Sequence, residues 1–264
     1  MSVLVQSFPS KNDNISAYHV MDVRIAGKNI RINYLYKSII DVCSNYFYHF
    51  SSPDIIVFSS NSEIEHFIKK NSIGFIPRKE DYFGYNVAIM YDYDYYETLL
   101  ICEKIADCLI NFGIMMIHGA AIEINGKCFV FSAPSGVGKT THILNWRKVF
   151  PNTSVINGDK PFIDVVNRIV YGSPWRGKEG LGINASTHLS GVVLLERSLS
   201  NSIRSVQFEK IIPKFIQQIH IPQDDVMALR AYRYFYEFND IPFYQLFCTA
   251  DARSAIVAYD GLKI

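Results

Sequence analysis

The most regular hydrophobic pattern in this chain lies in residues 94–112. Its apolar side chains recur three and four positions apart, which places them on one face of a helix. They are Leu99, Cys102, Ile105, Ala106, Leu109 and Ile110. We therefore predict a helix from Asp94 to Phe112 that packs this face against a core.

The first third of the chain carries strand patterns instead. Runs of β-branched and aromatic residues predict strands at 17–25, 30–36, 53–59 and 86–91. Gly27-Lys28 supplies a turn between the first two. A helix is expected from Ser62 to Lys70, because Ser62 and Glu65 have the spacing of a capping box. These elements indicate a β-rich N-terminal region, residues 1–93.

A hairpin and a glycine-rich loop follow the predicted helix. Ile114–Ile124 is a β-type run that contains His118-Gly119, Asn125-Gly126 is a strong two-residue turn, and Lys127–Ser132 is the return strand. A second helix is expected from Lys139 to Lys148, directly after the loop. Strand, glycine-rich loop and helix form the context in which a phosphate-binding loop occurs.

The loop itself reads Ala133-Pro-Ser-Gly-Val-Gly-Lys-Thr140, and it matches the pattern G-x-x-x-x-G-K-[ST] except that Ala133 replaces the first glycine. Glycines let the backbone curl so that its N–H groups face a phosphate, and the positive end of the following helix adds to this attraction. Lys139 would reach the outer phosphates of ATP, and the Thr140 hydroxyl would bind Mg²⁺. The predicted nucleotide-binding residues are Ser135, Gly136, Val137, Gly138, Lys139, Thr140 and Thr141. The alternative is a glycine-rich turn that binds nothing.

The remainder of the chain alternates strands, loops and helices. Ser154–Ile156 predicts a strand, after which Asp159 stands in a loop. The segment 172–182 contains four glycines, so we expect it to lie outside the core. Asp224-Asp225 is expected to begin a helix. A strand at Phe243–Cys248 and a helix from Ala250 complete a second domain, residues 94–264.

Composition favours a folded protein without a broad electrostatic partner. Hydrophobic residues make up 49% of the chain and charged residues 19%, which is enough for a substantial core. A formal net charge of +1 argues against binding to nucleic acid or to an anionic membrane. The five cysteines show no metal-ligand spacing, so reduced thiols are expected. No leader and no membrane span are visible in the pattern, and a cytoplasmic protein is expected.

Several motifs occur in the order in which HPr kinases carry them. They are His118-Gly119, the Asn125-Gly126 turn, Ser135–Thr140, Val155–Asp159, and Arg176–Ile183 followed by Leu189–Leu195. Over residues 95–200 the chain therefore resembles HPr kinases, and most closely the HPr kinase-like proteins encoded with modified-peptide pathways. ATP-dependent phosphoenolpyruvate carboxykinases share this core. The resemblance implies an α/β (α+β) fold, with a phosphate-loop core on a mixed, largely antiparallel sheet.

The resemblance also implies which residues take part in catalysis. Relatives carry an Asp-Asp pair, in which one carboxylate helps to bind metal and the other acts as a base. Gly158-Asp159 stands there in this chain, so Asp159 is the candidate base, and Glu179 joins Thr140 and Asp159 as a candidate metal ligand. His118 would contact the γ-phosphate or the acceptor, and Lys139 and Arg176 would neutralise charge. The alternatives are a turn role for Asp159, a core role for His118 and a solvated turn around Arg176.

These residues together predict an ATP- and Mg²⁺-dependent kinase that transfers the γ-phosphate to a hydroxyl of a peptide, protein or small molecule. The missing second Asp favours an alternative, a nucleotide-binding regulatory or assembly protein without transfer activity. A carboxykinase-like reaction has less support, because no His/Asp set for a transition metal is visible. The relatives include homo-oligomers, so self-association is a further expectation.

Overall fold

The computed structural model describes residues 4–6, 18–72 and 93–264 of the chain. Its contacts divide the chain into two compact units, Met1–Ile105 and Ala106–Ile264. The division falls inside helix α3 (Tyr93–Ile110), which confirms the helix predicted from the apolar stripe. The domain boundary expected at residues 93 and 94 stays a prediction. The strand expected at 86–91 lies outside the described residues.

The first unit contains a four-stranded sheet of order β1-β4-β3-β2. Its strands are β1 (Leu4–Gln6), β2 (His19–Ile25), β3 (Lys28–Tyr34) and β4 (Ile55–Phe58). Strands β2 and β3 form an antiparallel hairpin, whereas β1 and β3 both run parallel to β4. The turn between these strands was predicted at Gly27-Lys28, but it lies one residue earlier in the chain. Ala26-Gly27 makes the connection, with φ values of 49° and 74°.

Two further helices belong to this unit, α1 (Ser38–Cys43) and α2 (Asn61–Ser72), with a 3-10 turn η2 (Ser44–Tyr46). Helix α2 confirms the predicted helix, but Ser62 as its cap is wrong. Ser60 Oγ accepts a hydrogen bond from Glu63 N at 3.4 Å and donates one to Glu63 Oε2 at 3.0 Å. The capping box therefore lies two residues earlier, because the helix begins almost directly after β4.

The second unit is built on a nine-stranded mixed sheet, so the fold is a mixed α/β one. Its strands are β5 (Ile114–Met116), β6 (Gly119–Ile124), β7 (Lys127–Ser132), β8 (Ser154–Asn157), β9 (Phe162–Asp164), β10 (Ile169–Tyr171), β11 (Ser186–Arg197), β12 (Ser202–Val206) and β13 (Phe243–Cys248). The order is β5-β9-β10-β11-β7-β6-β8, and β13 joins β11 to β12. Strand β11 runs parallel to β7 and β13, and the other pairs among these strands are antiparallel.

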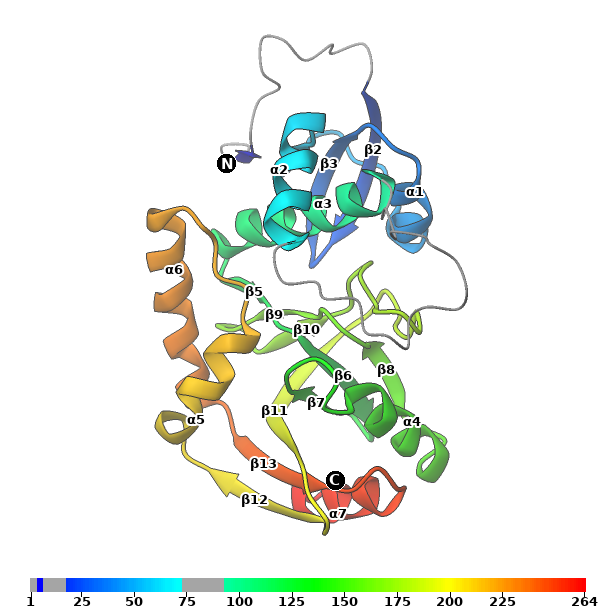
Figure 1. The fold of residues 1–264 in the computed structure, drawn as a ribbon, viewed down its shortest axis with the longest axis vertical. Coiled ribbons are helices and arrows are strands. Elements are labelled where there is room, and N and C mark those ends of the chain that lie inside the picture. The colour runs from blue at the N-terminus through cyan, green and yellow to red at the C-terminus, as the bar shows by residue number, and fades with distance from the viewer. Residues whose placement is uncertain (1–3, 7–17, 73–92) are drawn as a thin grey trace. The chain divides into compact units, whose positions relative to one another are not determined.

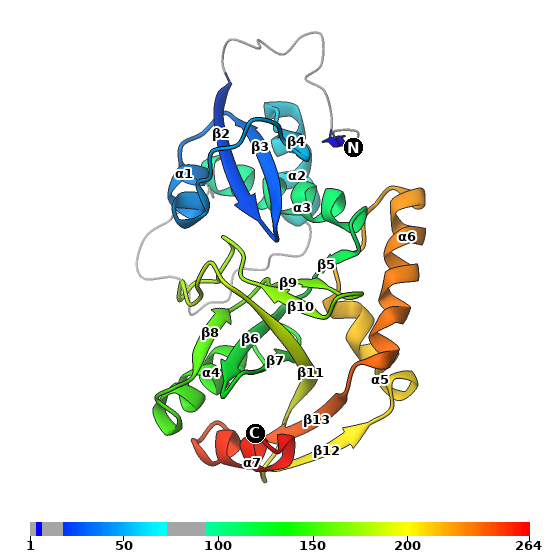
Figure 2. The same cartoon turned by 180° about the vertical axis from the view of Figure 1, so that it is seen from behind.

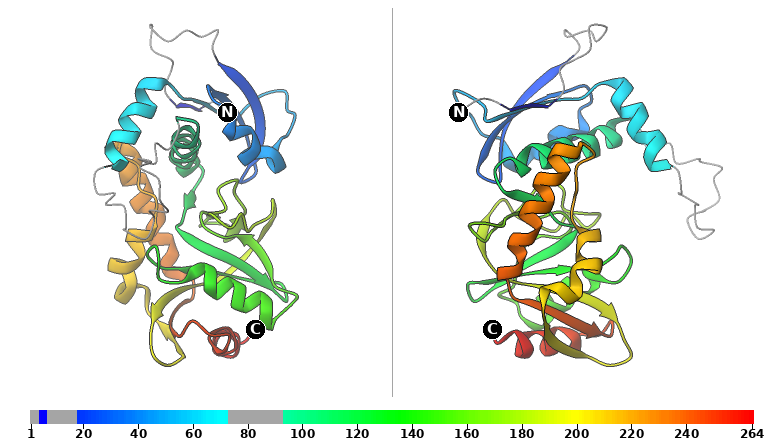
Figure 3. Two further views of the ribbon diagram at one scale, coloured as in Figure 1. Left: turned by 45° about the vertical axis from the view of Figure 1, so that its right-hand side comes forward. Right: turned by 90° about the vertical axis from the view of Figure 1, so that its left-hand side faces the viewer.

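Helices cover both faces of this sheet. Helices α4 (Lys139–Val149) and α7 (Arg253–Leu262) pack on one face (Figure 1, Figure 2). The other face carries α5 (Phe208–Phe215), α6 (Asp225–Tyr236) and the 3-10 turns η4 (Ile216–Gln218) and η5 (Glu237–Asp240) (Figure 3). Alternate strand residues point to opposite faces. Val193 and Leu195 of β11 accordingly pack with α4, and Val192 and Leu194 with α5.

The hairpin before the loop follows the prediction with one interruption. The β-type run Ile114–Ile124 contains two strands, because the chain leaves the sheet at His118 between β5 and β6. There, Ile117 bridges to Ile219 and His118 N donates to Gln218 O at 2.7 Å. This break turns His118 away from the strand and towards the loop region.

The remaining predicted elements can also be compared with the structure. Helix α4 and strands β8 and β13 confirm the predicted elements, and Asp224 caps α6 by accepting from Met227 N at 2.9 Å. The segment 172–182 is only partly an exposed loop, since Trp175 is 6% exposed and the residues from Gly172 are buried with it. No helix in the described ranges is both long enough and apolar enough to cross a membrane.

Candidate functional site

The glycine-rich loop connects β7 to α4 through a tight curl. Val137 N donates to Pro134 O at 3.3 Å, which closes the turn. Gly138 has a φ of 122° at the start of α4, a conformation that residues with a Cβ rarely adopt. Ser135, Gly136 and Thr141 are exposed, and Thr140 is half-buried in the first helical turn. The loop therefore presents accessible backbone at a helix N-terminus, where an anion is attracted.

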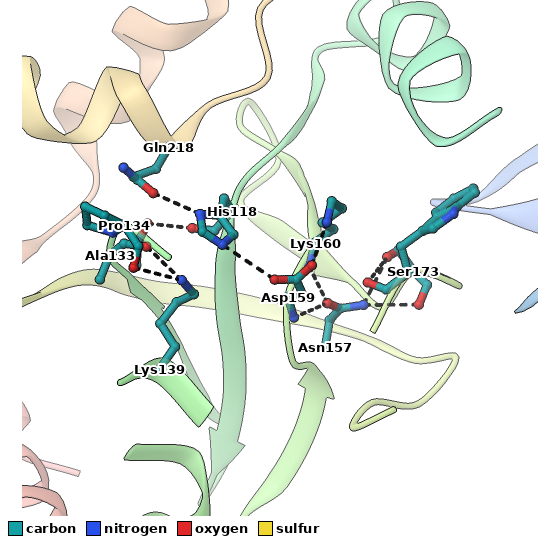
Figure 4. Close-up of polar contacts among 11 residues, drawn as sticks. His118, Ala133, Pro134, Lys139, Asn157, Asp159, Lys160, Ser173 and Gln218 are labelled. Carbon is teal, nitrogen blue, oxygen red and sulfur yellow. Dashed lines mark hydrogen bonds and ion pairs between the residues drawn. The ribbon is translucent and has the colours of Figure 1, made fainter. Parts of the chain in front are cut away.

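Lys139 reaches back across the beginning of this loop. Its side chain is largely buried, with 8% of the residue exposed, and Nζ donates to Ala133 O at 2.8 Å and to Pro134 O at 3.4 Å (Figure 4). Burial lowers the pKa of Lys139, while Asp159 raises it and Lys160 lowers it. An ammonium held over the loop is placed to contact the outer phosphates of a nucleotide.

Arg197 holds the same loop from outside and was not predicted. It ends β11, the parallel neighbour of β7, and its guanidinium donates to Gly136 O and, from Nε at 3.1 Å, to Val137 O. Arg197 therefore fixes two carbonyl oxygens of the loop. No local pattern reveals this contact, because it joins residues about 60 positions apart.

His118 stands between two side chains. Its Nδ1 lies 3.0 Å from Gln218 Oε1, and its Nε2 lies 3.5 Å from Asp159 Oδ1 (Figure 4). An amide oxygen only accepts hydrogen bonds, so Nδ1 carries the hydrogen, and Nε2 of a neutral ring carries the lone pair. Burial, and after it the charge of Lys139, lower the pKa of His118. The ring is therefore neutral near pH 7, with a basic nitrogen facing Asp159.

The loop that carries Asp159 is held by Asn157. This buried amide accepts hydrogen bonds from Asp159 N at 2.8 Å and Lys160 N at 2.7 Å, and its Nδ2 donates to Ser173 O at 3.1 Å. The Asp159 Oδ2 atom pairs with Lys160 Nζ at 2.6 Å. The turn chemistry expected in this loop therefore belongs to Asn157, and the Asp159 carboxylate is directed towards His118 and Lys160.

The segment after Trp175 docks against the Asp159 loop. Gly158 N donates to Leu181 O at 2.8 Å. Gly177 has a φ of 75°, and a Cβ built on it would lie 3.1 Å from Asp159 Cβ and 3.9 Å from Glu179 Oε2. The two candidate carboxylates thus flank the same glycine. Arg176 instead turns to Gly182, where Nη1 donates to the carbonyl oxygen at 3.3 Å.

The structure therefore gathers most of the predicted site residues. Lys139, His118 and Asp159 lie close enough to influence one another electrostatically, and Glu179 lies beside Asp159. Arg176 lies in the adjoining segment with its guanidinium at Gly182. Sequence reasoning missed Gln218, Lys160 and Arg197. Of these, Lys160 alone had a local signal, because it follows the singled-out Asp159.

A comparison of this chain with models of known protein families finds no match. A comparison with curated proteins finds no match either. The assignment of a function to this site therefore rests on its geometry and on general chemistry.

Proposed function

We propose that this protein is a kinase that binds ATP through the loop Ser135–Thr141 and transfers its γ-phosphate to a hydroxyl group. The observation that carries the proposal is that the side chains of Lys139, His118 and Asp159 lie close together beside the loop. A cation can neutralise charge on the phosphates, and a carboxylate with a neutral imidazole can take a proton, so this set of groups suits phosphoryl transfer.

The surrounding fold supports a core of the HPr kinase and phosphoenolpyruvate carboxykinase type. The hairpin β6–β7 leads into the loop, and the sheet around it is mixed and largely antiparallel. Ras-type proteins carry their phosphate loop on a doubly wound parallel sheet instead. The docking of the segment from Arg176 to Gly182 onto the Asp159 loop adds support, because both segments carry the resemblance.

The donor set suits Mg²⁺. This ion prefers oxygen ligands and, in phosphate-transfer sites, takes one or two carboxylates together with water and substrate phosphates. Asp159 and Glu179 flank Gly177, and Thr140 supplies a hydroxyl in the first turn of α4. These three residues would hold the ion, which would neutralise charge on the triphosphate.

In the proposed reaction the acceptor oxygen attacks the γ-phosphorus. The bond from that phosphorus to the β,γ-bridging oxygen breaks, and ADP leaves with the electron pair. His118 accepts the hydroxyl proton at Nε2, and Asp159 Oδ1, 3.5 Å away, stabilises the resulting imidazolium. This division moves the base role from Asp159 to His118 and so compensates for the missing second Asp.

A transfer assay tests this function directly. The protein is mixed with Mg²⁺, γ-labelled ATP and a panel of hydroxyl-bearing peptides and small alcohols. We expect a labelled phosphomonoester to form in step with ADP, and the rate to fall when Mg²⁺ is chelated. Tight ATP binding with no labelled acceptor in the whole panel would contradict the kinase and favour a nucleotide-binding regulatory protein.

A further inference from the structure

A cavity of about 400 Å³ opens beside the phosphate loop, and its wall is mostly apolar. It lies between that loop, the carboxyl end of β11 and the segment from α5 to η4. The apolar residues that line it are Ala133, Pro134, Val137, Leu194 and Leu195. Concave sites of this size and lining commonly bind small organic molecules, with a few polar groups that fix their orientation.

The charged residues of the lining leave the cavity with one net positive charge. Arg197 and Lys214 are cationic, and Glu196 is anionic. The Glu196 carboxylate accepts from Lys214 Nζ, so these two charges offset each other. Among residues 4–6, 18–72 and 93–264, no carboxylate forms an ion pair with Arg197. A ligand with a single negative charge would therefore complete the charge balance of the cavity.

Arg197 is held in place by the loop, although it is exposed to solvent. Its Nε donates to Val137 O at 3.1 Å, and its Nη2 donates to Gly136 O. These bonds use the edge of the guanidinium from Nε to Nη2. In the described part of the chain, no residue bonds to Nη1, so the edge from Nη1 to Nη2 can receive a ligand.

The second edge of a guanidinium has the fork geometry that binds both oxygens of a carboxylate. The two loop carbonyl oxygens already restrict the Arg197 side chain, so a ligand loses less affinity to the ordering of that side chain. A phosphate monoester carries close to two negative charges at neutral pH and would exceed the single unmatched charge. A monocarboxylate matches it.

We propose that this cavity binds a small monocarboxylate with an apolar body. The carboxylate would pair with the outer edge of Arg197, and the apolar body would pack on the wall formed by the loop and β11. The proposal concerns binding alone and involves no covalent step. It is independent of the proposed kinase function, and its test contains neither nucleotide nor Mg²⁺.

Three probes with one apolar body and different head groups test this site. They are (para-fluorophenyl)butyrate, (para-fluorophenyl)butanol and (para-fluorophenyl)butylammonium, and fluorine NMR titrations of the full chain give the Kd of each. We expect saturable binding of the butyrate with a Kd on the order of 1 mM or below. The butanol should bind at least about tenfold more weakly, because it lacks the charge-assisted contact, and the butylammonium should bind more weakly still.

Two variants assign this preference to Arg197 and to the cavity. Arg197→Gln removes the charge and should weaken butyrate binding at least about tenfold, with butanol binding within about twofold. Butanol binding thus reports whether the cavity is intact. Gln217→Glu, at an exposed lining position, adds a negative charge and should weaken butyrate binding at least about threefold.

Matched control variants lie outside the lining. Arg233→Gln on α6 and Gln207→Glu before α5 are at exposed positions and should leave the Kd of all three probes unchanged. Equal affinity of the wild type for butyrate and butanol, or no saturable butyrate binding up to about 10 mM, would overturn the proposal. So would an Arg197→Gln protein that keeps the preference for butyrate.

Discussion

Replacing Asp159 by Asn is expected to lower kcat for phosphoryl transfer by about 100- to 10,000-fold, while ATP binding measured without Mg²⁺ changes by less than about threefold. The carboxylate lies 3.5 Å from His118 Nε2, where in the proposed reaction it would stabilise the imidazolium that forms as the proton is taken. An amide of the same shape cannot offset that charge. Because ATP contacts the loop before the proton moves, we expect the loss of rate to come mainly from the chemical step and not from ATP binding.

The fold should tolerate this substitution. The backbone contacts of the residue, from Asp159 N to Asn157 Oδ1 and from Gly119 N to Asp159 O, are independent of its side chain. Asp225→Asn, at an exposed position in the first turn of α6, is the matched control and should keep full activity. Steady-state rates together with ATP titrations measure both effects. An Asp159→Asn protein with normal kcat would remove this carboxylate from the mechanism.

The second large effect concerns stability in acid. Trp146 Nε1 donates to His142 Nε2 at 2.8 Å, so Nδ1 carries the hydrogen and faces Ser254 Oγ at 3.3 Å. This chain of contacts ties α4, the helix behind the phosphate loop, to α7. The imidazole is 3% exposed, and burial lowers the pKa of His142 from 6.5 to about 3. The folded protein therefore keeps His142 neutral.

Between these two pKa values the unfolded chain binds more protons than the folded chain, so the free energy of unfolding falls as the pH falls. The stabilisation that comes from keeping His142 neutral is fully present when the pH is above 6.5, the ordinary pKa of the group. It is lost progressively as the pH falls towards about 3, the pKa in the folded protein. We expect His142 alone to lower the free energy of unfolding by about 1.4 kcal/mol per pH unit within this window, which amounts to roughly 3 kcal/mol by about pH 4.

Denaturant unfolding at about pH 7 and about pH 4 measures this loss. His142→Gln should be less stable than the wild type at the higher pH, because it loses the Trp146 contact, and should lose less stability on acidification. His188→Gln, at an exposed histidine of β11, should follow the wild type. Equal pH dependence in the wild type and His142→Gln would show that His142 is not held neutral.

Local patterns were enough to predict the parts of the fold that position the loop. The Asn125-Gly126 turn fixes the hairpin β6–β7, and the glycine-rich run with Lys139 marks the start of α4. Asp224 was found because N-capping depends on neighbours three residues away. These features depend on short stretches of chain, which is why the sequence alone reveals them.

Contacts between distant segments were not predictable in the same way. Gln218 meets His118 across about 100 residues, and Arg197 meets Gly136 across about 60. The burial of Trp175 likewise depends on how its segment docks, although its glycine-rich composition suggested an exposed loop. The base role proposed for His118 depends on Gln218, because the amide oxygen determines which ring nitrogen is basic.

Binding of ATP to the phosphate loop is the central claim, and calorimetric titration of the protein with ATP and Mg²⁺ tests it most directly. We expect saturable binding by the wild type, and binding at least about tenfold weaker by Lys139→Met, which removes a charge-assisted contact to the phosphates. Lys148→Met, in the last turn of the same helix, should bind like the wild type. No heat of binding with the wild type, or equal affinity in Lys139→Met and the wild type, would contradict the claim.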